Sequence, residues 1–514
     1  MIFKKYIITV AFLLFSYFSF AQNHLDALRY GRQFYSGTAK SDAMANSLSA
    51  LGADMSSLVV NPAGIAVFKK DVFAFTPNFI INNTESVFLN NERKESKYGF
   101  NFSNIGYVWV VQKDGLFKNL NFGITYNSFN DYRSRVVASG DNPNGSILDY
   151  FVYNSNSDRY SVFREDLAWR AWLINYDETA GEYWSYVTDD GTYGENQRYE
   201  EETKGGGGEF TFSAGGNIGN KLYIGMSLGL TTVNYTEESV YSEYNFPVIY
   251  AEDADNPGDS IQVNPNRLDY RQYLYSEGTG INGKFGFIYQ PFEFLRIGAA
   301  VHTSTGYDFD DEYMTSMYVD YPVADSNGYY DYEPDTSNVF SWSLQTPFRA
   351  NLGLAFIAGS HKIGKFYTVP ATFTLDYEYV DYSRAELKSD YYSFDAENYA
   401  TYDLMQASHS IRAGAEFNFG FMKIRGGYAV YTSPYKKDTG FFDNAKSIYS
   451  GGIGFANEHS FVDISYSYAS SSETLNMYGA ANVFPYDPMG DKTEPTADVD
   501  NAKQFIKVTL GVRF

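Results

Sequence analysis

Apolar and polar residues alternate along most of the chain, from Val72 to the C-terminal Phe514, with the period of two that is typical of β-strands. Between Leu222 and Leu230, for example, Leu, Ile and Met occupy every second position, and Tyr, Gly and Ser lie between them. The pattern predicts fourteen strands, with expected ranges 72–81, 98–111, 119–129, 209–217, 221–235, 271–290, 295–315, 338–357, 370–387, 406–419, 422–432, 447–457, 460–472 and 503–514.

The connections between these strands differ systematically in length. Those after odd-numbered strands are long, above all residues 130–208 and 236–270, whereas those after even-numbered strands are shorter, such as 420–421. Each strand has at least the roughly 9 residues needed to cross hydrocarbon at a tilt. A soluble β-sandwich shows the same alternation, but an even strand number with short turns at one end favours a closed transmembrane β-barrel. We therefore predict an all-β fold, a 14-stranded antiparallel transmembrane barrel.

The two ends of the chain indicate where this barrel is placed. Residues 1–21 resemble a secretory signal peptide, because Lys4 and Lys5 precede an apolar stretch and the small-x-small box Ser19–Ala21 precedes Gln22. The last strand ends on Phe514, and such endings resemble the signal that barrel assembly machinery reads. We expect residues 71–514 to form a barrel in the outer membrane of a Gram-negative cell, with that machinery and outer-membrane lipid as partners.

Composition excludes several classes of function. The chain has 514 residues, 62 acidic against 39 basic side chains, and a net charge of −23, which argues against binding a nucleic-acid backbone. It has no Cys, which excludes disulfides, thiol nucleophiles and Cys metal ligands. Mean hydropathy is −0.35 and no long apolar run follows the N-terminus, so a helical membrane protein is not expected.

Two motifs associated with enzymes occur in the predicted strands. Gly225–Gly229 matches the G-x-S-x-G nucleophile motif, which requires a turn from a strand into a helix, but here the alternation continues. Gly278–Lys284 matches a nucleotide-binding glycine pattern and leads into alternation instead of a helix. The five His residues show no metal-ligand spacing. We therefore expect neither an enzyme nor a bound cofactor or metal.

Residues 22–70 do not alternate and precede the first predicted strand. Ser41 and Asp42 can cap a short helix that carries Met44, Leu48 and Leu51 and ends at Gly52. Because a barrel of fourteen strands would otherwise leave an aqueous channel, this segment is expected to form a helical plug in the lumen.

The same segment resembles a known family. Gly37-Thr38-Ala39, Ala43-Met44-Ala45, Asp54–Ser57, Asn61-Pro62-Ala63-Gly64 and the strand opening Phe73–Pro77 are similar to the FadL/TodX family of outer-membrane transporters for hydrophobic compounds. The resemblance implies a hatch in which Asn61, Pro62, Ala63 and Gly64 form the gating turn, and a fatty acid-like hydrophobic ligand. Pro62 would fix its own φ, and Gly64 would permit a positive φ. The long 130–208 connection departs from the family pattern.

Two further sets of residues have more than one interpretation. The alternation places Arg296, Arg349, Arg412 and Arg425 toward the lumen, where we expect mostly ion pairs and, for some, contact with a ligand carboxylate. Tyr160, Phe163, Leu167, Ala171 and Ile174 lie at helical spacing in the long loop, near Trp169 and Trp172. They predict either a core for the loop itself or a hydrophobic landing groove for ligand.

Three functions remain open from the sequence. The leading one is passive uptake of hydrophobic or amphipathic molecules, such as long-chain fatty acids, through a plug-gated lumen with a possible lateral exit. The alternative is a similar barrel that serves as a binding or assembly module for secreted proteins. The third is a membrane-embedded hydrolase, for which no Ser–His pair is evident. A ligand-sized cavity beside the plug would favour the first, and a solidly packed lumen the second.

Overall fold

The computed structural model describes residues 23–252, 258, 260–322, 329–333, 338–360, 362–363, 366–437, 445–479, 489 and 493–514. The expected signal peptide, residues 1–21, lies outside these residues. None of the helices in the described ranges is both long and apolar enough to cross a membrane.

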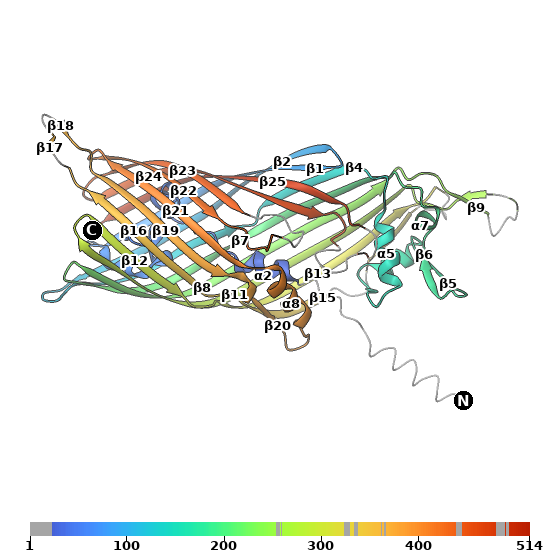
Figure 1. Cartoon of the computed structure of the whole chain (residues 1–514), viewed down its shortest axis with the longest axis horizontal. Coiled ribbons are helices and arrows are strands. Elements are labelled where there is room, and N and C mark those ends of the chain that lie inside the picture. Colours follow the sequence, from blue (N-terminus) through green and yellow to red (C-terminus); the bar gives the residue numbers. More distant parts are fainter. Residues whose placement is uncertain are drawn as a thin grey trace.

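Strands dominate the described chain and close into one barrel (Figure 1). Its fourteen antiparallel spanning strands are β1 (Val72–Phe88), β2 (Asn91–Gln112), β3 (Phe117–Asp131), β7 (Asn196–Ile218), β8 (Leu222–Tyr244), β11 (Arg267–Phe292), β12 with β13 (Leu295–His302, Gly306–Asp320), β15 with β16 (Asn338–Gln345, Arg349–Ala358), β19 (Ala371–Asp381), β21 (Ala407–Asn418), β22 (Met422–Tyr431), β23 (Lys446–Ala456), β24 (Ser460–Asn476) and β25 (Thr496–Arg513). The barrel closes where β25 pairs with β1, with Arg513 opposite Val72.

Short elements occupy the lumen and one end of the barrel. The N-terminal segment contains α2 (His24–Gly31), α3 (Ala39–Ala43), α4 (Ser57–Val60) and η1 (Pro62–Val67). A cap at the end opposite the C-terminus contains α5 (Ile147–Ser155), α6 (Glu165–Arg170), β5 (Asn175–Asp177), β6 (Glu182–Trp184), α7 (Tyr186–Asp190), β9 (Tyr250–Glu252) and β10 (Ser260–Gln262) (Figure 1). The remaining elements are β4 (Ser134–Asp141), β14 (Tyr329–Tyr332), β17 (Lys362–Ile363), β18 (Phe366–Tyr367), η2 (Tyr382–Arg384), β20 (Glu386–Lys388) and α8 (Asp395–Leu404).

The predicted fourteen-stranded barrel is confirmed, but several strands are longer than the alternation indicated. β7 begins at Asn196 and β8 continues to Tyr244, so the connections expected at 130–208 and 236–270 are shorter than predicted. The sequence of 196–204, which includes three consecutive Glu residues, lacks an apolar face. These extensions rise beyond the part of the wall that needs an apolar exterior, so period-two alternation could not reveal them.

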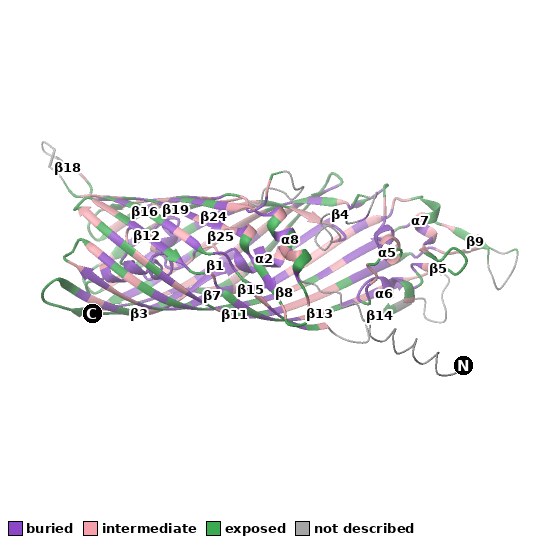
Figure 2. Ribbon diagram, turned by 60° about the horizontal axis from the view of Figure 1, so that its bottom comes forward, coloured by how far each residue is buried: buried purple, intermediate pink, exposed green. Residues whose placement is uncertain are grey.

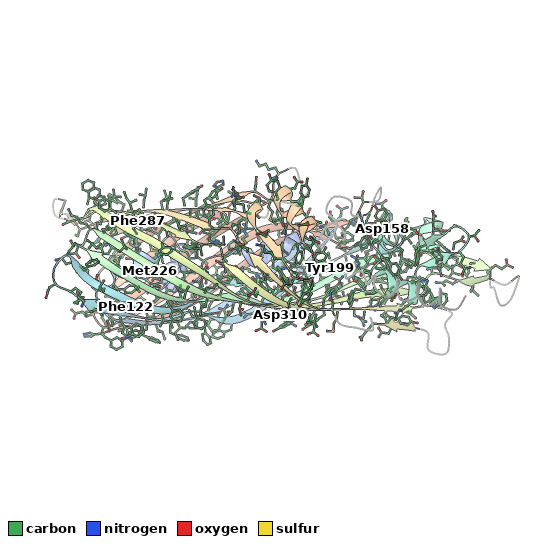
Figure 3. All side chains as sticks on the ribbon, turned by 90° about the horizontal axis from the view of Figure 1, so that it is seen from below. Phe122, Asp158, Tyr199, Met226, Phe287 and Asp310 are labelled. Carbon is green, nitrogen blue, oxygen red and sulfur yellow. The ribbon has the colours of Figure 1, made fainter. Side chains whose placement is uncertain are left out.

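The outside of the barrel is apolar near the end that carries the C-terminus. Phe122, Met226 and Phe287 project outward there (Figure 3) and are 44–57% exposed. Along β8, for example, buried and exposed positions alternate through the part with an apolar exterior (Figure 2). Leu228 faces outward, whereas the neighbouring Ser227 is buried with its Oγ 2.7 Å from Ser213 Oγ. The faces assigned from the sequence are therefore confirmed in this strand.

Replacing Leu228 with Arg tests this exterior. A charged side chain facing the bilayer midplane costs about 2–4 kcal/mol in a transmembrane barrel, so Leu228→Arg should lower the free energy of unfolding in lipid by that amount. Leu228→Ala, which removes the same apolar contact without adding charge, should cost much less. Denaturant titration in vesicles measures both; equal losses would mean that Leu228 does not face lipid.

The closing strand gives a second test. The backbone N–H of Phe514 donates to the Asp71 carbonyl at 3.0 Å, and its ring is 68% exposed on the outside of the barrel. Deleting Phe514 removes both this bond and the outward aromatic side chain that directly follows β25. We expect less heat-modifiable barrel in the outer membrane; unchanged levels would argue against the C-terminal assembly signal.

Candidate functional site: a plugged lumen and an internal cavity

The Asn61–Gly64 turn is buried between the plug and the barrel wall. Asn61 is fully buried, and its Nδ2 donates to the Ser49 carbonyl at 2.6 Å and to the Phe287 carbonyl of β11 at 3.1 Å. Its Oδ1 accepts from the Ala63 N–H at 3.1 Å, which caps η1, and Pro62 occupies the first position of that helix. The amide of Asn61 thus joins the turn, the rest of the plug and the wall.

Gly64 is required for a different reason from the one predicted. It is absent from the described glycines with positive φ, so backbone freedom is not what this position needs. A Cβ at Gly64 would lie 2.4 Å from Ser57 Oγ. The backbone N–H of Gly64 donates to the Asn61 carbonyl at 2.9 Å. Close packing of η1 on α4 therefore requires glycine here.

The prediction of a helix that runs from Ser41 to Leu51 is wrong. Thr38 is the N-cap, accepting from the Ser41 N–H at 3.1 Å, and α3 ends at Ala43. Ala45 and Asn46 then adopt left-handed φ values of 50° and 58°, which stop the helix. The Asn46 Nδ2 donates to the Tyr35 carbonyl at 2.9 Å, so local side-chain bonding replaces the helical ladder.

Inward glycines of the wall let the plug backbone approach closely. A Cβ on Gly225 would lie 2.4 Å from the Pro62 carbonyl oxygen, and one on Gly298 would lie 2.1 Å from the Ser49 carbonyl oxygen. The wall glycines whose added Cβ would fall within 3 Å of the plug are Gly215, Gly225, Gly286, Gly298, Gly353, Gly414, Gly427 and Gly452. Each belongs to a different one of eight spanning strands, so residues 43–65 are in tight contact with much of the wall.

Two of the predicted inward arginines donate hydrogen bonds to the plug backbone. Arg349 Nη2 donates to the Gly31 carbonyl at 3.1 Å, and Arg296 Nη1 donates to the Leu51 carbonyl at 2.7 Å. Arg349 and Arg412 both contact Glu378, each at 3.3 Å. The Glu378 carboxylate of β19 thus pairs with two arginines, of which Arg349 also bonds to the plug.

Arg412 and Arg425 are the most enclosed of the four. The guanidinium of Arg412 lies 4.9 Å from the centre of the Tyr35 ring, and Arg425 contacts Glu416 at 2.6 Å and Asp463 at 2.5 Å. None of the four predicted arginines lines the internal cavity described next. The structure gives Arg349, Arg412 and Arg425 ion-pair partners, whereas Arg296 donates to Gln290 and to the Leu51 carbonyl. Contact of any of the four with a ligand stays a prediction.

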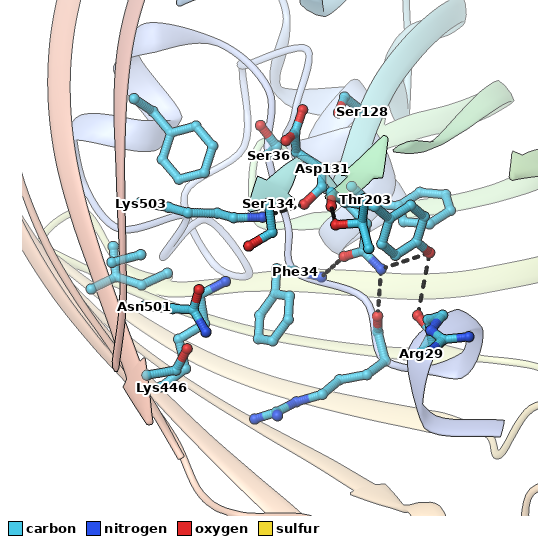
Figure 4. A pocket seen from close by; sticks show the side chains of 18 of the residues that line it. Arg29, Phe34, Ser36, Ser128, Asp131, Ser134, Thr203, Lys446, Asn501 and Lys503 are labelled. Atoms are coloured by element: carbon cyan, nitrogen blue, oxygen red, sulfur yellow. Dashed lines mark hydrogen bonds between the residues drawn. The ribbon is translucent and has the colours of Figure 1, made fainter. Parts of the chain in front are cut away.

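Above the packed part of the plug lies a cavity of about 400 Å³ (Figure 4). Apolar side chains from the plug and the wall line part of it, namely Leu25, Leu28, Phe34, Phe129, Val136, Ile448, Ala469 and Phe505. Charged and polar groups line the rest, including Arg29, Arg32, Asp131, Glu201, Lys446, Glu473, Asn501 and Lys503. Sequence reasoning missed these residues as a group because they come from segments far apart in the chain.

The wall beside this cavity is interrupted. β3 and β4 both pair with β7 and form one strand that is kinked at Tyr132–Arg133. β3 pairs with β2 only from Asn119 to Asn127, and in the described chain no backbone ladder joins residues 91–103 of β2 to β3 or β4. Instead, β4 lies against β1, whose Asn82 Nδ2 donates to the Arg133 carbonyl at 3.0 Å. Between residues 91–103 of β2 and the kinked strand, side-chain contacts such as Arg93 Nε to Ser139 Oγ and Arg135 to Glu95 take the place of a backbone ladder. We call this interruption of the ladder the side gap.

The cap closes the opposite end through its own core. Leu167, Ala171 and Ile174 are fully buried and pack with barrel residues such as Leu268 and Met317. The loop-core interpretation of the helical spacing is therefore confirmed, although α6 itself spans only Glu165–Arg170. Trp169 and Trp172 are 48% and 62% exposed, and their role as a landing groove stays a prediction.

The N-terminal helix α2 carries a buried ion pair at the cavity edge. Burial raises the pKa of Asp26 to about 6, and the guanidinium of Arg29, 2.6 Å away, opposes this rise. Arg29 also contacts Glu237 of β8 at 3.3 Å. In the described ranges, no cluster of three or more His, Asp or Glu side chains is arranged to hold a metal ion.

The two enzyme-like motifs lie inside strands, as expected. Gly225–Gly229 is part of β8, where Gly225 contacts Pro62 and Ser227 bonds to Ser213. Gly278–Lys284 is part of β11, and Lys284 pairs with Glu209. Neither segment forms the turn into a helix on which its motif's chemistry depends.

This architecture defines a class: a transmembrane β-barrel whose lumen is filled by an N-terminal plug. It is similar to the crystal structure of a Pseudomonas aeruginosa FadL homologue, with a TM-score of 0.54 and 12% identity over 94% of this chain and 100% of that one. It is also similar to a deletion mutant of the TodX monoaromatic hydrocarbon channel, with a TM-score of 0.50 and 12% identity over 93% and 98%. No family model and no curated protein matches the sequence. The chain thus has the FadL/TodX fold, which confirms at that level the resemblance seen in the plug motif.

Proposed function

We propose that this protein is an outer-membrane channel for passive uptake of hydrophobic or amphipathic small molecules, such as long-chain fatty acids. The observation that carries the proposal is the cavity of about 400 Å³ between plug and wall, which has the volume of a small-molecule site and a partly apolar lining. The names of the similar structures, a FadL homologue and a hydrocarbon channel, support the same class of cargo.

Because the plug is tightly packed, a ligand route through the side of the barrel is favoured over a route along the barrel axis. Wall glycines bring residues 43–65 against the strands below the cavity, so passage to the C-terminal end would need the packed plug to move. The cavity reaches the side gap instead, because Asn101 of β2 and Ser128 of β3 both line it. Phe100 and Phe102, 46% and 49% exposed, give the gap an apolar outer margin.

Arg133 lies across this gap. Its Nη2 donates to the Phe100 carbonyl of β2 at 3.1 Å, and its Nη1 lies 3.3 Å from Asp131. The guanidinium therefore supplies a hydrogen-bond donor to a backbone carbonyl of β2, in the part of the strand that has no ladder with β3 or β4. We propose that ligand leaves the cavity between β2 and the kinked strand, into the outer-membrane lipid.

A binding or assembly module for secreted proteins is the alternative. A solid lumen would favour it, and the cavity argues for the channel. The two are separated by measuring uptake of radiolabelled oleate in cells that lack their own fatty-acid channel, with and without this protein at confirmed barrel levels. Faster uptake with the protein supports the channel, whereas unchanged uptake with normal insertion favours the module.

A further inference from the structure

Five lysines lie at the end of the barrel that carries the C-terminus. Lys113 and Lys118 flank the β2–β3 turn, Lys221 lies in the β7–β8 turn, and Lys69 and Lys70 connect the plug to β1. All five are exposed, and within the described ranges none of them has a carboxylate at ion-pair distance. The chain as a whole carries a net charge of −23, so this basic edge differs in sign from the rest of the molecule.

The two basic turns are held side by side. Lys113 and Lys118 are directly opposite each other, because the Lys113 N–H donates to the Lys118 carbonyl at 3.0 Å. The Gly219 N–H of the β7–β8 turn donates to the Leu116 carbonyl at 2.9 Å, which places the turn that carries Lys221 beside this pair. Like charges directly opposite each other on paired strands repel, so Lys113 and Lys118 destabilise this edge unless an anion lies between them.

The side chains around these lysines suit a lipid surface. Leu116 and Phe117 are 70% and 40% exposed, at the edge of the apolar exterior. A register shift between Phe117 and Asn119 marks a β-bulge in β3, and both Phe117 and Lys118 are exposed there. A lysine at such an edge lays its apolar stem on the exterior and places its ammonium among the lipid head groups.

The acidic residues nearby do not balance this charge. Asp71 accepts from the Val110 N–H at 2.7 Å, and Asp114 and Glu293 are exposed without an ion pair to any described residue. Outer-membrane barrels have their short turns on the periplasmic side and their long loops outside the cell. The lysines therefore lie at the periplasmic leaflet, where the head groups are those of phospholipids.

We infer that Lys113, Lys118 and Lys221 bind the phosphate of an anionic phospholipid in the periplasmic leaflet of the outer membrane. A phosphate accepts charge-assisted hydrogen bonds from ammonium groups, and Leu116 and Phe117 contact the acyl chains of the same lipid. A zwitterionic phospholipid has no net charge to offset the repulsion between the lysines, so an anionic head group is the expected class. An acidic periplasmic protein would match the charge, but the exposed apolar side chains favour lipid. The inference does not depend on the cargo of the channel.

The test uses Trp109 of β2, which is 46% exposed on the outside of the barrel. The other four tryptophans lie in the cap or are buried inside the barrel. Lipids with brominated acyl chains quench Trp fluorescence on contact, so vesicles of the full chain compare brominated phosphatidylglycerol with brominated phosphatidylcholine beside Trp109. We expect the wild type to prefer phosphatidylglycerol by roughly fivefold or more, the gain that one lysine near an anionic lipid surface gives. Replacing Lys113, Lys118 and Lys221 together with Gln should remove that preference.

A second triple variant is the matched control. Lys94→Gln, Lys204→Gln and Lys388→Gln remove the same charge from exposed positions toward the capped end and should keep the preference. Heat-modifiability shows that each barrel is folded, and quenching that remains in Trp109→Phe is subtracted as background.

Three outcomes would overturn the lipid site. The first is a preference for phosphatidylglycerol that persists without Lys113, Lys118 and Lys221. The second is an equal loss in the control variant, which would trace the preference to overall charge. The third is a wild type without any preference, which would assign the lysines to an acidic protein partner or to solvent.

Discussion

Uptake of labelled oleate should fall strongly when Asn61 and Pro62 are both replaced by Ala, although the barrel inserts normally. Asn61 supplies the donor for the Ser49 and Phe287 carbonyls, and each buried carbonyl left without a donor costs about 1–3 kcal/mol. Losing Pro62 also frees the φ angle that begins η1. A plug loosened in this way no longer presents a defined cavity floor.

The measurement is uptake in cells with matched amounts of heat-modifiable barrel, together with ion conductance in planar bilayers. We expect conductance to rise as the plug loosens. A Lys70→Ala variant, a change at an exposed position just after the same helix that leaves Asn61 in place, serves as the control. Wild-type uptake and conductance in the double variant would show that the turn has no gating role.

The substitution Gly225→Ala, which adds one methyl group to the inner face of β8, should displace the Asn61–Gly64 turn from the barrel wall. The new Cβ would meet the Pro62 carbonyl oxygen at 2.4 Å, a backbone atom that cannot rotate away. Overpacking of this kind typically costs about 1–3 kcal/mol, and here it acts on the contact between η1 and β8. Gly225→Ala should therefore speed hydrogen exchange in residues 57–67 and reduce uptake.

Gly426→Ala is the matched control for this change. It is also a glycine inside a spanning strand, but its nearest neighbour to an added Cβ is the Ser450 carbonyl oxygen at 3.9 Å. It should leave exchange and uptake unchanged. Equal effects of the two substitutions would mean that general strand destabilisation, and not the plug contact, is responsible.

The sequence predicts the membrane part of this fold well because the bilayer imposes a strict pattern there. Every strand that crosses it needs an apolar outer face, so residues such as Leu228 and Ser227 alternate visibly. Beyond the membrane this constraint ends. The extension of β7 over 196–204 and the kink at Tyr132–Arg133 therefore carry no periodic signal.

The plug and the cavity were less predictable for a different reason. The inward charge of Arg349 or Arg412 follows from strand alternation, but its partners depend on which strands become neighbours. Ala45 and Asn46 adopt left-handed φ values, and the Ala45 N–H donates to Ser450 Oγ of the distant strand β23, so local helix signals could not predict where this helix ends. Lys446 and Phe34 are more than 400 residues apart in the sequence, and only the closed barrel brings them together.

The side gap between β2 and the kinked strand is the feature on which the proposed route depends. The chain has no Cys, so a pair introduced at Asn101 and Ser128 gives a single site for a short, reducible thiol cross-linker. A pair at Tyr107 and Ile124, which are already opposite each other in the β2–β3 ladder, is the control. Both pairs are introduced into otherwise identical chains at matched barrel levels.

The decisive measurement is the rate of oleate uptake before cross-linking, after it, and after reduction. The account predicts that bridging Asn101→Cys to Ser128→Cys lowers uptake to the level of cells without the protein, that reduction restores it, and that the Tyr107→Cys and Ile124→Cys bridge has no effect. Undiminished uptake through a fully bridged gap would contradict the lateral route.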